Sequence, residues 1–169
     1  AGVYAGTSKK ITIGLQNSGK EALDCTARSG SFVVTADGLP IEVETSPRSC
    51  AGWMELSPSQ FTLAPGEGQT VYINITAPKD SGGGYYGIVS FHGVPQSSDE
   101  ALGEGRVRAG IRFSHKVMAV VMLTVPSSEM RAIIEAAQPM VEELPDEDGY
   151  RFALPVRNLG NIHTRMGGK

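Results

Sequence analysis

Three histidines, two cysteines and a row of basic residues are the side chains of this sequence that could do chemistry or hold a ligand. His92, His115 and His163 lie far apart in the sequence. None has a second histidine or an acid at the spacing that a metal site or a catalytic pair requires. The sequence contains no nucleophile elbow, phosphate-binding loop or zinc-protease motif. It therefore favours a protein that binds rather than catalyses, and it predicts neither a cofactor nor a metal site.

The two cysteines suggest a structural role. Cys25 and Cys50 lie outside any CxxC pattern and outside any histidine-containing spacing, which argues against zinc. Cys25 is expected to point inward because it alternates with Leu23 and Ala27, and Cys50 closely precedes Trp53. We interpret the pair as a disulfide, with two buried thiols as the alternative. A disulfide would indicate an oxidising compartment and hence an extracytoplasmic protein.

A basic stripe precedes a long apolar run in the second half of the chain. On a single strand over residues 106–125, the arginines of the stripe would share a face that could meet an acidic partner, with a solvated outer face as the alternative. Residues 117–125 are uncharged and rich in β-branched side chains, which favours a strand over a helix. At a sheet edge, such a strand could pair with an extended segment of another protein. The candidate partner-binding residues are Arg106, Arg108, Arg112, Lys116, Val117, Ala119, Val121, Leu123 and Val125.

The elements that must position these residues are predicted to be short strands. Residues 61–63 and 71–76 alternate on either side of a Pro-Gly turn, which predicts a hairpin with one buried face. After the breaker run that ends in Gly82–Gly84, residues 85–91 read as a third strand of a meander, with Val89 and Phe91 on one face and Ile88 on the other. The spacing of strands and turns along the chain predicts an all-β fold, an immunoglobulin-like antiparallel β-sandwich.

Composition limits the kind of partner. The chain has 169 residues, 40% of them hydrophobic, and a formal net charge of -3. A nucleic-acid-binding surface would need a strongly basic face, so nucleic acid is not expected as a partner. No apolar run approaches the length that crosses a bilayer, so this segment is not expected to span a membrane.

The chain is predicted to divide near Pro126. Residues 1–126 hold the sandwich, and residues 127–169 hold too few strands to bury a core of their own. The second part is expected to be the start of a further, incomplete immunoglobulin-like domain, or an arm that completes the sheet of another domain or chain. Pro155 restricts the strand that alternates over residues 150–158 to a sheet edge or a bulge.

Three neighbouring segments carry a resemblance to known proteins. Their matching residues are Trp53, Leu56, Pro58, Phe61, Leu63, Pro65, Gly66 and Glu67, then Val71, Ile73, Ile75 and Pro78, then Gly84, Tyr85, Tyr86 and Gly87. On these residues, the chain resembles the N-terminal domain of bacterial secreted proteins related to the pilus-assembly chaperones. It is similar also to cell-wall proteins that interact with WxL-domain proteins, and more remotely to the major sperm protein domain. Residues 157–163 resemble the opening of the second immunoglobulin-like domain of the same proteins.

The resemblance implies a bacterial, extracytoplasmic, non-enzymatic protein, either periplasmic or on the cell surface. Such a protein would be a subunit or scaffold that contacts other proteins, including copies of itself, through strand edges, with cell-wall glycan as a further candidate ligand. A pilus chaperone that completes a subunit by donor-strand pairing is the second hypothesis. Those chaperones hold a carboxylate with an arginine of the first strand and a lysine of the last strand of domain one. Residues 3–5 supply no such arginine, and Arg112 or Lys116 could stand for the lysine.

Overall fold

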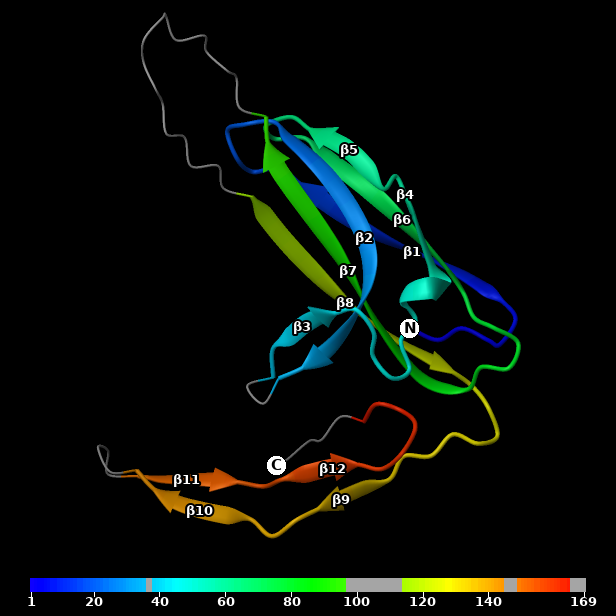
Figure 1. Ribbon diagram of the computed structural model, residues 1–169, viewed down its shortest axis with the longest axis vertical. Helices are drawn as coiled ribbons and strands as arrows, with labels where there is room; N and C mark the ends of the chain where they lie inside the picture. The colour runs from blue at the N-terminus through cyan, green and yellow to red at the C-terminus, as the bar shows by residue number, and fades with distance from the viewer. Residues whose placement is uncertain (36–37, 97–113, 145–148, 165–169) are drawn as a thin grey trace, which may run out of the picture.

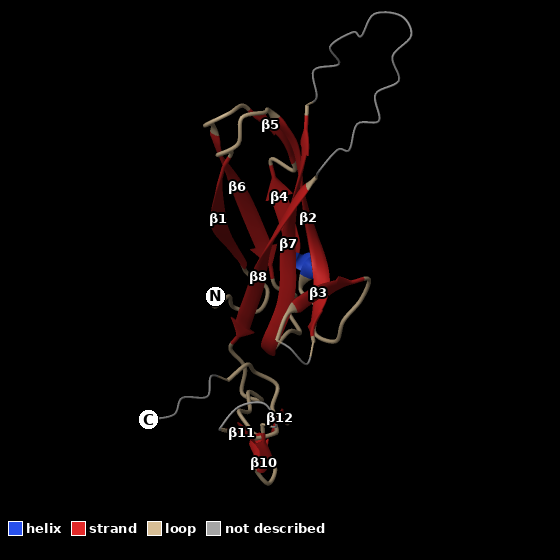
Figure 2. Ribbon diagram, turned by 90° about the vertical axis from the view of Figure 1, so that its left-hand side faces the viewer, coloured by secondary structure: helices blue, strands red, loops and turns tan. Residues whose placement is uncertain are grey.

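A two-layer β-sandwich carries a two-stranded arm at one end (Figures 1 and 2). The structure is a computed structural model that describes residues 1–35, 38–96, 114–144 and 149–164. Among these residues, the sandwich is built from a three-residue 3-10 helix, η1 (Ala51–Trp53), and from β1 (Ser8–Gln16), β2 (Leu23–Val34), β3 (Pro40–Val43), β4 (Met54–Ser57), β5 (Gln60–Leu63), β6 (Gly68–Thr76), β7 (Gly83–Pro95) and β8 (His115–Val125). The prediction of an all-β, immunoglobulin-like fold is confirmed.

The two layers are antiparallel sheets. One sheet has the order β1-β6-β4, and the other has the order β3-β2-β7-β8, with β5 pairing the first residues of β2. β7 pairs β2 on one side and β8 on the other, and its ladder with β8 runs from Gly83 opposite Val125 to Gly93 opposite His115. β8 therefore lies at the edge of its sheet, which is visible in Figure 2.

The core lies between the layers and follows from alternation along the strands. Val71, Ile73 and Ile75 of β6 are fully buried against Val89 and other apolar residues of the opposite sheet. Fully burying side chains of this size stabilises a fold by about 1.5 to 3 kcal/mol each. The rings of Trp53 and Tyr85 close one end of this core with centroids 4.2 Å apart.

The predicted hairpin and meander are wrong. β5 pairs β2 of the opposite sheet rather than β6, and β6 pairs β1 and β4 rather than β7. The turn at Ala64–Glu67 and the segment from Ala77 to Gly82 each carry the chain from one sheet to the other. Alternation identified the buried face of β6 correctly, but it does not show which strand lies alongside.

The arm is a long two-stranded ladder. Its strands are β9 (Ile134–Ala136), β10 (Met140–Glu143), β11 (Tyr150–Ala153) and β12 (Val156–Asn158). β10 pairs β11, and β9 pairs β12, so the arm runs out and back with an interruption at Leu154–Pro155. Its strand residues are exposed or half-buried. The division of the chain at residue 126 remains a prediction.

Candidate functional site

The free edge of β8 is the first element of the candidate site. At its far end, Ala1 and Val3 lie alongside: the N–H of Thr124 donates to the Ala1 carbonyl at 2.9 Å, and the N–H of Val3 donates to the Thr124 carbonyl at 3.1 Å. The Ala1 nitrogen also donates to the Met122 carbonyl at 2.7 Å. Antiparallel strands aim the main-chain groups of alternate residues at the same side, so those of Lys116, Met118 and Val120 also point to this edge. There they meet no backbone partner among the described residues.

The side chains of β8 divide between the core and the outer face. Val121, Leu123 and Val125 are buried in the core, and their main-chain groups face β7, so they are not available to a partner. Val117 is exposed and Ala119 is half-buried. The apolar side chains that β8 presents outward are instead Met118, Val120 and Met122, at 39%, 44% and 40% exposure. Arg106, Arg108 and Arg112 lie outside the described residues.

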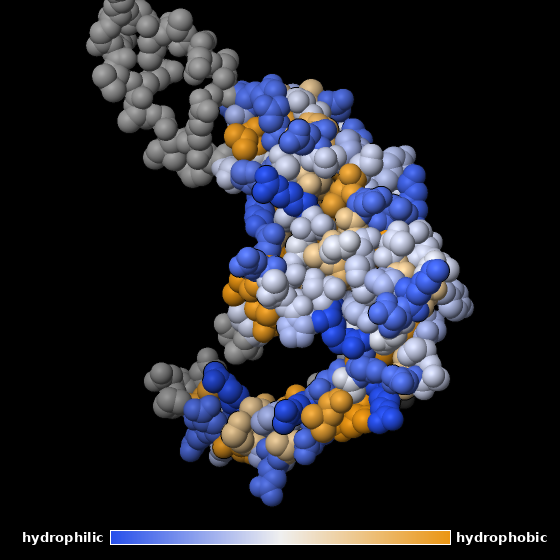
Figure 3. Space-filling view, turned by 45° about the vertical axis from the view of Figure 1, so that its right-hand side comes forward, coloured by the Kyte–Doolittle hydropathy of each residue, from blue (hydrophilic) through white to orange (hydrophobic). Residues whose placement is uncertain are grey.

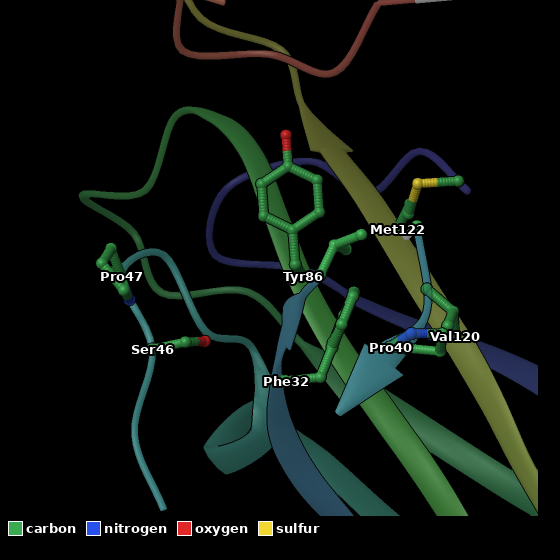
Figure 4. A pocket seen from close by; sticks show the side chains of 9 residues that line it. Phe32, Pro40, Ser46, Pro47, Tyr86, Val120 and Met122 are labelled. Atoms are coloured by element: carbon green, nitrogen blue, oxygen red, sulfur yellow. The ribbon is translucent and has the colours of Figure 1, made fainter. Parts of the chain in front are cut away.

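An apolar groove lies beside this edge on the outer face of the sheet (Figure 4). Its volume is about 380 Å³, and Figure 4 shows Tyr86 of β7 with Pro47 on one side and Met122 of β8 on the other. In the register of that hairpin, Phe32 lies opposite Glu42 and Val34 lies opposite Pro40, so these residues share the groove side. The groove is lined by Phe32, Val34, Gly38, Pro40, Ser46, Pro47, Tyr86, Val120 and Met122.

An ion pair fixes the β2–β3 hairpin to β8. The Lys116 ammonium lies 2.5 Å from the Glu42 carboxylate, and that carboxylate occupies the space that a side chain on Gly30 would need. The pair therefore spans the outer face of the sheet. Along β8, Lys116 is nine residues from Val125, where the arm begins, which corresponds to roughly 30 Å. The lysine is thus remote from the junction of sandwich and arm.

That junction is built on the glycine run at the start of β7. The N–H of Gly84 donates to the Asn161 carbonyl at 2.6 Å. Asn161 also makes three hydrogen bonds to the segment between β8 and β9. Its N–H donates to the Arg131 carbonyl, its Oδ1 accepts from the Arg131 N–H, and its Nδ2 donates to the Glu129 carbonyl. A Cβ on Gly83 would lie 2.7 Å from the Asn161 carbonyl oxygen. The glycine run is therefore not only a turn, as the sequence suggested. Because its residues have no side chains, the arm can lie directly against the backbone of β7.

Arg48 supports the same place from the sandwich side. Its guanidinium donates to the Gly84 carbonyl at 2.6 Å and to the Gly82 carbonyl, and it lies over the Tyr85 ring at 4.5 Å. Arg48 has a φ of 58°, in the left-handed region that non-glycine residues rarely adopt. Its role was missed by sequence reasoning, since a lone arginine after a proline carries no motif.

The arm side of the junction contributes a histidine. The His163 ring packs edge-on against the Tyr86 ring with centroids 6.0 Å apart. Burial raises the pKa of the Tyr86 hydroxyl, and the Arg48 charge opposes that rise. His163 Nδ1 and Ser127 Oγ are buried without a hydrogen-bond partner among the described residues.

The predicted disulfide is wrong, because the structure contains two free, buried thiols. The Cys25 sulfur lies beside Gly93, and the Cys50 sulfur lies beside Gly87. These glycines are six residues apart on β7, so the thiols are separated by roughly 20 Å, far beyond the reach of a disulfide. Burial raises the pKa of Cys50 to about 11, and burial followed by the nearby Asp24 charge raises the pKa of Cys25.

The described residues show no group of three or more His, Cys, Asp and Glu side chains placed to hold a metal ion. His92 and His115 lie near the upper end of the β7–β8 ladder, whereas His163 lies at the arm, so the histidines are not brought together. Among the described residues, no helix has the length and apolar character needed to cross a membrane.

Comparison with known proteins identifies the fold of this chain but does not assign the chain to a family. No family model matches the chain, and no curated protein matches it. Among solved structures, it is similar to a chain of the CsuC–CsuE chaperone–tip adhesion subunit pre-assembly complex from archaic chaperone–usher Csu pili of Acinetobacter baumannii. That match has a TM-score of 0.50 and 14% identity, and it covers 95% of this chain and 68% of that chain.

Two further structures extend the comparison. PapD-like domain 7 of human CEP192 has a TM-score of 0.48 at 14% identity, covering 76% of this chain and 80% of that chain. SSP-19, an MSP-domain protein family member of Caenorhabditis elegans, has a TM-score of 0.45 at 15% identity, covering 72% and 92%. At these identities the likeness shows the fold alone. The predicted likeness to the pilus-chaperone sandwich is confirmed at that level.

Proposed function

We propose that this chain is a non-enzymatic, extracytoplasmic binding or structural subunit that contacts other proteins through strand pairing at the β8 edge. The observation that carries the proposal is the row of main-chain groups at Lys116, Met118 and Val120, which have no backbone partner among the described residues. An exposed sheet edge of this kind accepts an extended segment as an added strand, and main-chain hydrogen bonds then supply the affinity.

The composition of the edge supports this use. Proteins usually block a free edge with charged side chains, proline or a covering element. The described edge carries one lysine, Lys116, whose charge is paired with Glu42. Next to it, the outward side chains of Met118 and Val120 provide apolar neighbours for the side chains of an added strand.

Amide hydrogen exchange tests the proposal with an internal control. The probe is a synthetic nine-residue peptide of alternating valine and threonine, compared with the same peptide N-methylated at every residue, so that neither of its edges can donate a main-chain hydrogen bond. Binding is expected to slow exchange at the amides of Lys116, Met118 and Val120. The amides of Val117, Ala119 and Val121 face β7 and are protected beforehand. Equal effects of both peptides, or no protection of the edge amides, would contradict the proposal.

The chaperone alternative requires a cation where sandwich and arm meet. Lys116 is paired with Glu42 near the other end of β8, and Arg112 lies outside the described residues. A carboxylate-binding role for Lys116 is therefore disfavoured. We expect the valine–threonine peptide to bind equally well with a free or an amidated C-terminus. A strong preference for the free carboxylate would favour the chaperone hypothesis.

The extracytoplasmic location is part of the proposal. It is supported by the resemblance to secreted sandwich proteins, since the free thiols remove the disulfide as an argument. Cell-wall glycan is retained as a second candidate ligand, to be measured with soluble peptidoglycan fragments in the same exchange experiment. Glycan binding that leaves the edge amides unprotected would place the ligand on another surface.

A further inference from the structure

We propose that residues 1–3 form an intramolecular strand that competes with partners for the β8 edge and restricts an added strand to the part of β8 from Lys116 to Val120. The competition rests on the proposed function, since it requires that partners bind at this edge. It adds to that function a segment that regulates the edge and a preferred length for the partner strand.

The edge of β8 is divided into a covered part and an open part. Gly2 lies parallel to Thr124, and the N–H and carbonyl of Thr124 are both bonded to the main chain of residues 1–3. From Lys116 to Val120, the main-chain groups that face the edge have no backbone partner among the described residues. The open part corresponds to roughly 16 Å of extended chain. An added strand longer than this would have to displace residues 1–3.

A single buried side chain anchors the covering segment. Val3 is 4% exposed and packs with Ala77 and Val125 in a small cluster of its own. The two residues before Val3 are exposed, and the Lys9 ammonium donates to the Gly2 carbonyl at 2.9 Å. Segments with so few buried contacts open locally at a much lower free energy than core strands do. The cover is therefore an element that a partner strand can displace.

The surroundings let the segment open without unfolding the sandwich. The arm follows β8, yet an open notch separates it from the sandwich at this end (Figure 3). Beyond the segment, the Gly6 N–H donates to the Ala77 carbonyl at 2.9 Å, and the Ala77 N–H donates to the Thr7 carbonyl at 3.0 Å. These bonds hold the chain where it enters β1, so release is confined to the first few residues.

Competition with this segment sets the length of strand that the edge prefers. A partner that spans only the open part gains its main-chain hydrogen bonds without breaking any. A partner that continues along Met122 and Thr124 gains further bonds only after it has broken those of residues 1–3. Gain and loss then nearly cancel, so extra length adds little affinity while the segment is in place. Once the segment is released, the same extra length should add affinity in full.

Titration with two peptides tests the competition on the full chain. Both are acetylated and amidated and alternate valine with threonine; one has five residues, and the other has nine and can span β8 from Lys116 to Thr124. Slower exchange of the Val120 amide reports binding. The wild type should bind the two peptides within about threefold of each other. Val3→Asp places a charge in the buried cluster and should release the segment, so this variant should bind the longer peptide at least about tenfold more tightly than the shorter.

A second readout and two further variants exclude a general loss of structure. In Val3→Asp, the Thr124 amide should be protected by the nine-residue peptide and not by the five-residue peptide. Tyr4→Asp introduces the same charge one residue further along, on a side chain that is 70% exposed, and should bind both peptides as the wild type does. Val3→Ala should show the preference for length in weaker form. Unchanged exchange at the Ile73 amide of β6 would show that the core is intact in each variant.

The outcomes separate the competition from the proposed function. If neither peptide protects the edge amides in the wild type or in any variant, the proposed function fails and the competition with it. If the five-residue peptide protects the edge but Val3→Asp shows no preference for the longer peptide, only the competition is overturned. The same holds if Tyr4→Asp shows the preference equally, or if the wild type already binds the longer peptide tenfold more tightly.

Discussion

The backbone nitrogen of Gly84 lies 2.6 Å from the carbonyl oxygen of Asn161, and this hydrogen bond joins the first residues of β7 to the arm. The contact is close enough that a Cβ at position 84 would lie 3.2 Å from that oxygen and 3.1 Å from the Ile162 Cα. Position 84 does not require glycine for its φ, so the glycine serves the approach of the arm. The arm can therefore lie this close to β7 only because residue 84 has no side chain.

Gly84→Ala is expected to loosen the arm. The added methyl group would overpack the junction by about 1 to 3 kcal/mol, a cost that the protein can relieve by breaking the Asn161 contact. Hydrogen exchange at residue 84 and limited proteolysis of residues 127–133 should both become faster. The β6 and β7 core amides should keep their protection, because the core lies on the other side of β7.

Gly14→Ala is the matched control for that change. Gly14 is also a strand glycine, but a Cβ there would meet no atom within 4 Å. Relief of glycine's conformational entropy should stabilise the protein by up to about 1 kcal/mol and leave proteolysis of the arm unchanged. Equal loosening of the arm by both substitutions would contradict the role assigned to Gly84.

Arg48→Lys should destabilise the sandwich by about 1 to 3 kcal/mol although it keeps the charge. Lysine lacks the planar fork with which Arg48 binds two carbonyls of the glycine run, and it stacks less well on Tyr85. Denaturant unfolding of Arg28→Lys supplies the comparison, since Arg28 is exposed on β2 and should change by less than about 0.5 kcal/mol. Similar losses for both variants would show that the carbonyl contacts of Arg48 contribute little.

Local sequence patterns predicted the strands but not their partners. The alternation of Val71, Ile73 and Ile75 indicated a buried face because side chains on a strand alternate with a period of two. Whether β5 lies beside β6 or crosses to β2 depends on packing between the two sheets, which short-range alternation does not encode. The hairpin and meander were the simplest pairing consistent with the pattern, and tertiary contacts overrode them.

The candidate site was predicted in part. Residues 117–125 are predicted to form a strand that could bind a partner at a sheet edge, and β8 lies at such an edge. The predicted binding residues, however, include side chains that β8 turns to the core. A one-residue offset exchanges the faces of a strand, so Met118, Val120 and Met122 are outward instead. The groove could not be foreseen, because Phe32, Tyr86 and Val120 come from three strands whose proximity follows from the sheet order.

Both cysteines are expected to be free thiols in solution. The intact mass should be unchanged by reductant, and alkylation of both thiols should be rapid in denaturant and slow in the folded protein, since the thiols are buried. Mass spectrometry with and without guanidinium measures this directly. A native mass lower by the two hydrogens of a disulfide, with no alkylation before reduction, would show that the thiols come together in a different arrangement.

The raised pKa of Cys50 predicts a loss of stability in alkali. The thiol is expected to have a pKa of about 11 in the folded protein against an ordinary value of 9.0 in the unfolded chain. Between these values the unfolded state has released a proton that the folded state retains, so the free energy of unfolding falls as the pH rises. The stabilisation is complete below pH 9, and roughly 2 to 3 kcal/mol of it is lost by about pH 11.

Cys50→Ala isolates this effect from other groups that titrate in alkali. Tyr86 also has a raised pKa and weakens the fold in the same direction, but it does so in both proteins. At neutral pH the variant should be less stable by about 1 to 2 kcal/mol, because it loses buried contacts beside Gly87 and Met54. Since it has no thiol to ionise, its denaturant midpoint should fall less steeply than that of the wild type from pH 9 to 11, so the two stabilities should converge and then cross by about pH 11. Parallel pH profiles for the two proteins would show that the Cys50 thiol ionises as easily in the folded state as in the unfolded chain.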